Sequence, residues 1–130
     1  MLLVDKAVAA SIAAIEIYNK PSFFYREEAF SILVLNAWEL LLKARIIQEN
    51  DNDFRSIEVR EAKNKKDGTA SKRLVAKRTR AGSTMTIGLT KASNIVRGYP
   101  KHRIDEVCLE NLGLLTEIRD NAIHLINAGN

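Results

Sequence analysis

An arginine and a histidine lie five positions apart near the C-terminal end of the chain, at Arg119 and His124. The planar guanidinium of arginine can donate two hydrogen bonds to a phosphate and keeps its charge at physiological pH. Histidine suits proton transfer, because its ordinary pKa of about 6.5 lies near working pH. The pair is therefore suited to acid–base chemistry at a phosphate, with Asp120 and Asn121 as supporting polar side chains.

A helix would place these two residues differently. At about 3.6 residues per turn, Arg119 falls inside a broad apolar arc, whereas His124 falls outside it beside Asp120 and Glu117. An arginine in an apolar arc costs free energy unless it is paired or faces a cleft. Structural alternatives stay open: Arg119 as a buried ion pair or as a side chain that extends to the rim of the core, and His124 as a surface partner of Asp120.

Apolar residues at intervals of three and four predict a mainly helical fold. The expected helices cover residues 2–19, 24–50, about 85–97 and about 102–127. Pro21 ends the first, and Ser83 or Thr84 is expected to cap the start of the third. The second helix is apolar nearly all round, which is typical of a central helix. Its Glu39 and Lys43 can pair at i, i+4.

Residues 55–80 are strongly basic. They hold ten Lys or Arg against three acidic residues, a net charge of +7 in a chain of net +4, so the remainder is net −3. This asymmetry suggests a polyanionic partner. Apolar and charged residues alternate on both sides of a turn-forming segment at 64–68, which predicts a basic β-hairpin or ordered loop, with a disordered loop as the alternative. The cations expected to contact the polyanion are Lys65, Lys66, Lys72, Arg73, Lys77, Arg78 and Arg80.

Composition limits the class of protein. At 130 residues, 46% hydrophobic and 6% aromatic, the chain suits a single domain over 1–130 with a core of Leu, Ile, Val and Ala. The single cysteine, Cys108, excludes an intramolecular disulfide and favours a reducing compartment, and we interpret it as a small core residue. No apolar run predicts a signal peptide or a membrane span. We therefore expect a cytoplasmic protein without a membrane partner.

The pattern Arg-polar-x-x-x-His on the last long helix resembles the R-x4–6-H motif of the HEPN superfamily. More narrowly, residues 6–43, with the segments Ile15-Glu16-Ile17-Tyr18-Asn19-Lys20-Pro21 and Asn36-Ala37-Trp38-Glu39-Leu40-Leu41-Leu42-Lys43, are similar to a HEPN-like bacterial family, domain of unknown function 3644. The resemblance covers most of the chain and is least specific in the basic segment. It implies a HEPN-like bundle of about four helices that carries the inserted basic hairpin or loop at about 55–82.

The resemblance also implies an activity. Many HEPN domains are dimeric, metal-independent endoribonucleases, and Arg119 and His124 match their catalytic pair. Asp120 matches the polar residue after the arginine, and Glu39 is the candidate acid of the early helix, with Lys43 beside it. The family region is expected to extend past Asn130.

RNA cleavage fits these residues, because RNA supplies its own nucleophile, the 2′-hydroxyl. No cofactor or metal is expected, since two histidines and one cysteine show no metal-ligand spacing. A homodimer would bring two copies of the last helix together. The first hypothesis is therefore a ribonuclease, such as a toxin or phage-defence effector with an antitoxin or other regulatory partner. The alternatives are a non-catalytic RNA- or nucleotide-binding module and a helical dimerisation module.

Overall fold

The computed structural model describes residues 2–64, 66 and 68–123 of the chain. Its elements, in chain order, are the helix α1 (Leu2–Tyr18), the helix α2 (Arg26–Glu49), a short 3-10 helix η1 (Phe54–Ile57), the strands β1 (Arg60–Asn64) and β2 (Ala70–Ala76), and the helices α3 (Leu89–Arg97) and α4 (Glu106–Ile123). Within these residues, four α-helices and one two-stranded antiparallel sheet confirm the predicted helical bundle with a hairpin.

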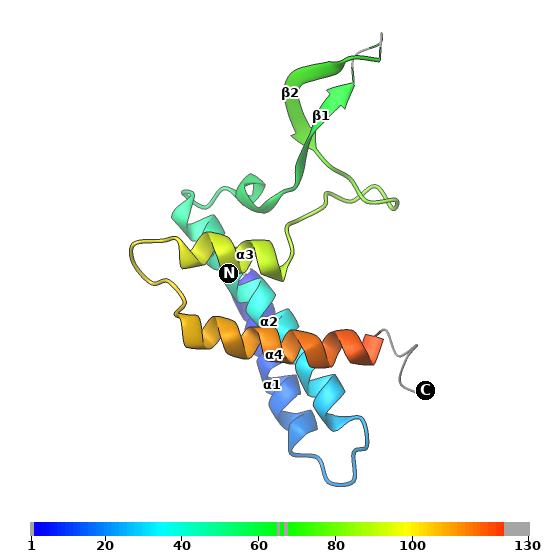
Figure 1. Cartoon of the computed structure of the whole chain (residues 1–130), viewed down its shortest axis with the longest axis vertical. Coiled ribbons are helices and arrows are strands. Elements are labelled where there is room, and N and C mark those ends of the chain that lie inside the picture. Colours follow the sequence, from blue (N-terminus) through cyan, green and yellow to red (C-terminus); the bar gives the residue numbers. More distant parts are fainter. Residues whose placement is uncertain (1, 65, 67, 124–130) are drawn as a thin grey trace.

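The helix α2 is the centre of the bundle. It runs antiparallel to α1, and α3 and α4 lie across it (Figure 1). The core combines Leu35, Leu42 and Ile46 of α2 with Val96 of α3 and Leu112 of α4. This explains why α2 is apolar nearly all round, because it packs against other elements on several sides. None of the described helices is both long and apolar enough to cross a membrane.

Two helices begin later than the sequence predicts. The helix α3 starts at Leu89 with Gly88 as its N-cap and no side-chain cap, so the expected cap by Ser83 or Thr84 is wrong. Residues just before it pair with distant segments instead: Thr86 bridges Glu58, and the Ile87 amide donates to the Ile57 carbonyl at 2.9 Å.

The start of α4 moves from about 102 to Glu106. His102 adopts a left-handed backbone conformation with φ of 53°, which an α-helix does not contain. The carboxylate of Asp105 accepts a 2.8 Å hydrogen bond from the Cys108 amide, and its carbonyl accepts one from Leu109. Asp105 therefore caps the helix, as acidic residues commonly do.

The strands β1 and β2 form a ribbon that projects from the helices (Figure 1). Their register pairs Arg60 with Ala76, Glu61 with Val75, Ala62 with Leu74 and Asn64 with Ala70, with an irregularity between Ala62 and Asn64. At the base, the Val59 amide donates to Met85 and the Lys77 amide donates to Val59, at 2.8 and 2.7 Å. We call residues 58–86 the basic arm; it is the hairpin that the sequence predicts.

Candidate functional site: the Arg119 helix and the basic arm

The core-facing side of α4 includes a stripe of residues spaced by three or four. Each member is at least partly buried: Cys108, Leu112, Leu115, Arg119 and Ala122. Arg119 is the charged member of this stripe, and 29% of its side chain is exposed. The helical wheel thus predicted its side of the helix, and the guanidinium lies at the edge of the core rather than in its interior.

Arg119 is paired with the residue that follows it. Its Nε and Nη2 atoms lie 3.3 and 3.2 Å from Oδ1 of Asp120, whose side chain is half exposed. An exposed ion pair of this kind contributes little to stability. The arrangement therefore leaves the guanidinium of Arg119 accessible to an incoming anion. Asn121 is exposed next to it, and His124 lies outside the described residues.

Glu39 and Lys43 form the i, i+4 pair that the sequence predicts. Lys43 is only 7% exposed, and its Nζ atom lies 3.1 Å from Glu39 Oε2 and donates a second bond of 2.9 Å to Thr86 Oγ1. Thr86 belongs to the basic arm, so this buried cation ties α2 to the base of the arm. Within the described ranges, no hydrogen bond or ion pair joins Glu39 or Lys43 to Arg119. In this structure the two residues connect α2 to the arm and do not contact Arg119 through such a bond.

The predicted nucleic-acid contacts lie along the basic arm. Lys66, Arg73, Lys77, Arg78 and Arg80 are all exposed, Lys72 lies in β2, and Lys65 is outside the described residues. Arg78 donates a 2.9 Å bond to the Gly82 carbonyl, which braces a second turn at residues 79–83. The exposed cations therefore occupy two parts of the arm, the ribbon and this turn.

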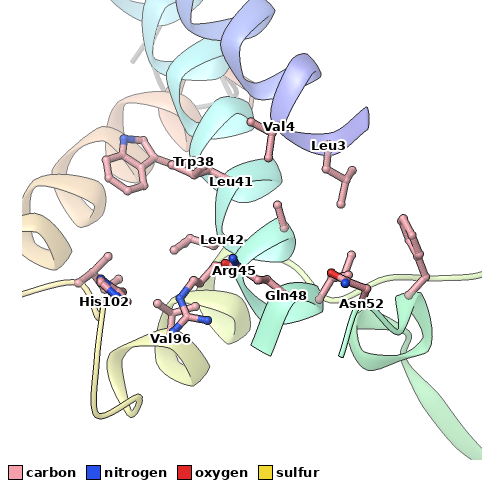
Figure 2. A pocket seen from close by; sticks show the side chains of 14 residues that line it. Leu3, Val4, Trp38, Leu41, Leu42, Arg45, Gln48, Asn52, Val96 and His102 are labelled. Atoms are coloured by element: carbon pink, nitrogen blue, oxygen red, sulfur yellow. The ribbon is translucent and has the colours of Figure 1, made fainter. Parts of the chain in front are cut away.

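A cleft of about 410 Å³ lies along α2, and sequence reasoning missed it. Figure 2 shows Trp38 and His102 at one end and Asn52 at the other, with Arg45 and Gln48 between them. Among the residues that the structure describes, none of the predicted site lines it. The signal was present, because Trp38, Leu41, Arg45 and Gln48 are spaced by three, four and three along one side of α2.

Arg45 holds one wall of the cleft in place. Its guanidinium lies 2.7 Å from Glu49 Oε2, donates to the Lys101 carbonyl at 3.1 Å and lies 4.9 Å from the centre of the Tyr99 ring. Burial, with the nearby charge of Glu49, raises the pKa of Tyr99 above its usual value. Arg45 is therefore largely occupied in joining α2 to the loop after α3.

Cys108 lies on the buried side of α4 and packs against the core. Burial raises the pKa of its thiol, and the negative charge of Asp105 adds to the effect. The thiolate is the reactive form of cysteine. The environment therefore disfavours a nucleophilic role and agrees with a small core residue.

Comparison with known proteins gives one match. The model of a protein family described as a domain of unknown function (DUF3644) matches residues 2–130. Among curated proteins and solved structures, no match was found.

Proposed function

This chain belongs to the DUF3644 family, and we propose that it is a HEPN-type, metal-independent endoribonuclease that uses Arg119 and His124. The observation that carries the proposal is the place of Arg119. A cation lies on the core-facing stripe of α4, 29% exposed, and among the described residues it is paired with the exposed carboxylate of the adjacent Asp120. The resemblance of Arg119 and His124 to the HEPN motif supports the same assignment.

The proposed reaction is a transesterification within the RNA. The 2′-oxygen attacks the adjacent phosphorus while the bond from phosphorus to the 5′-oxygen breaks. The products are a 2′,3′-cyclic phosphate and a free 5′-hydroxyl. Arg119 would stabilise the charge on the phosphate oxygens through its two-pronged donor geometry. His124 would accept the 2′-hydroxyl proton or protonate the leaving 5′-oxygen.

Two proton transfers need two groups, which favours a homodimer with two copies of α4 at the site. The exposed side of α4 supports this arrangement. Val107, Leu114 and Ile118 follow one another at intervals of seven and four and are 65%, 60% and 39% exposed. Such an apolar stripe suits a second copy of the helix. In a cell, the same activity would suit a toxin or phage-defence effector held in check by an antitoxin or another regulatory partner.

The second candidate function is a non-catalytic RNA-binding module. The basic arm favours it, because the arm carries the excess positive charge of the chain and its ribbon stands apart from α4 (Figure 1). A third candidate, a helical dimerisation module in which Arg119 is structural, would make no use of that charge. Salt-dependent RNA binding separates the second candidate from the third.

The test is incubation of the purified protein with total RNA in EDTA, followed by analysis of the fragment ends. We expect cyclic phosphate ends, and losses of about 100-fold or more in Arg119→Ala and His124→Ala. The two losses should not add, because both residues act in one transition state. Arg103→Ala is the control, since it removes an exposed arginine outside α4. Cleavage that disappears in EDTA, or that persists without His124, would show that the proposal is wrong.

A further inference from the structure

The basic arm has the shape of a narrow two-stranded ribbon with its sides open to solvent (Figure 1). Its register places Arg60, Ala62, Leu74 and Ala76 on one face and Glu61, Arg73 and Val75 on the other, because neighbouring residues of a strand point to opposite faces. Lys77 continues the second face through the bond from its amide to Val59. Arg73 and Lys77 are thus two cations about 13 Å apart along one face.

The arm is devoid of aromatic residues. After Phe54, the next aromatic residue in the sequence is Tyr99, so neither the ribbon nor the second turn at residues 79–83 offers a ring on which a base could stack. Proteins that bind single strands gain about 1–3 kcal/mol for each base that stacks on an aromatic ring. The arm lacks this aromatic stacking, so the electrostatic part dominates its binding free energy.

Electrostatic binding alone favours a duplex over a single strand. A double helix of nucleic acid carries roughly one charge per 1.7 Å of its axis, against one per about 3.4 Å along each of its strands. Each phosphate neutralised also releases more counterion on a duplex, about 0.9 against about 0.7 on a single strand. In a duplex, moreover, the bases are stacked inside the helix. The lack of aromatic groups on the arm therefore does not lower its affinity for a duplex.

The helical body restricts where such a duplex can lie. One side of α4 carries the exposed acids Glu106, Glu110, Glu117 and Asp120, and all residues outside 55–80 together have a net charge of −3. The arm therefore attracts a duplex more strongly than this side of α4 does. We therefore infer that the basic arm binds double-helical segments of RNA in preference to single strands, an inference that rests on the proposed RNA-directed function.

The experiment measures fluorescence anisotropy with a labelled, unstructured 16-nucleotide RNA, alone and annealed to its complement, over a range of salt concentrations. We expect the duplex to bind about tenfold more tightly or better at low salt. The triple variant Arg73→Glu, Lys77→Glu, Arg80→Glu should lose this preference and reduce the salt slope by about three. The control Lys20→Glu, Lys91→Glu, Arg103→Glu makes the same change in net charge at exposed positions outside the arm and should keep the preference.

Equal or tighter binding of the single strand would overturn the inference, as would an unchanged duplex affinity in the triple variant of the arm. Thermal unfolding of both triple variants checks that they fold. Cleavage of the unstructured strand is measured in parallel. Duplex preference without cleavage would leave the arm inference standing and remove the nuclease proposal, and cleavage without duplex preference would do the reverse.

Discussion

The helical body and the basic arm maintain their structures by different means. In the body, side chains such as Leu35, 1% exposed, pack into a shared core. In the arm, Leu74 is 58% exposed, and the shape is set by the backbone ladder and by the bonds of Val59, Lys77 and Met85 at its base. A segment shaped by backbone hydrogen bonds does not need apolar side chains packed in a core, so the arm can carry a basic surface.

The largest expected difference between the two regions comes from replacing a leucine by alanine, once in the body and once in the arm. Leu35→Ala should destabilise the protein by about 3 kcal/mol, because it removes a fully buried side chain and leaves a cavity. Leu74→Ala in the arm should change the free energy of unfolding by less than about 0.5 kcal/mol. Urea unfolding followed by circular dichroism measures both. Similar losses would mean that the arm is packed against something in solution.

The connection between the regions can be broken at Lys43. Lys43→Ala removes the partner of Glu39 and Thr86 at a buried position, and we expect a loss of about 2 kcal/mol. Lys43→Met keeps the aliphatic packing without the charge and should lie within about 1 kcal/mol of the original chain. If methionine costs as much as alanine, the ion pair rather than the packing provides the stability. Thermal unfolding of the two variants decides this.

Removal of the ribbon should have a smaller effect on stability. Residues 61–75 can be replaced by Asn-Gly, since Arg60 and Ala76 are cross-strand partners and this dipeptide suits a tight hairpin turn. We expect the body to keep its free energy of unfolding within about 1 kcal/mol, while RNA binding is weakened, because Lys77, Arg78 and Arg80 remain. Calorimetry and anisotropy measure the two properties. An unfolded product would contradict the separation of body and arm.

The smallest expected effect concerns Cys108. Because burial and Asp105 raise the pKa of its thiol, the thiolate fraction at a given pH is lower than in an unfolded chain, and it increases only as the pH rises toward the raised pKa. Iodoacetamide should therefore modify Cys108 several-fold more slowly in the folded protein than in urea at pH 8, because the thiolate is the nucleophile. Mass spectrometry over time gives both rates. Equal rates would place the thiol in solvent.

Local patterns predicted which elements form, but the ends of α3 and α4 depend on features that these patterns do not contain. The intervals of three and four in α1 and α2 are properties of the chain within a few turns, so these helices could be read directly. The start of α3 could not, because residues 85–87 pair with residues 57–59, almost 30 positions earlier in the chain. Likewise, His102 adopts a left-handed conformation that delays the start of α4, and its residue type alone does not predict that conformation.

The candidate site shows the same division. The side of α4 on which Arg119 lies and the pairing of Glu39 with Lys43 follow from helical spacing alone. The bond from Lys43 to Thr86 spans 43 positions, and the cleft along α2 needs residues from α1, α2, α3 and the loops. The spacing of Trp38, Leu41 and Arg45 indicates one wall of that cleft, but its other walls and the bond to Thr86 depend on tertiary packing, which no short pattern encodes.

The central place of α2 also determines the order in which the protein can fold. The contacts between α1 and α2 close a short turn, residues 19–25, whereas α4 meets α2 only after residues 50–105 have been looped out. Local contacts form fastest, because loop closure costs less entropy. We therefore expect the α1–α2 pair to be present in the folding transition state and α4 to dock after it, so that substitutions on α4 speed unfolding more than they slow folding. The helix that carries Arg119 would then complete the native state.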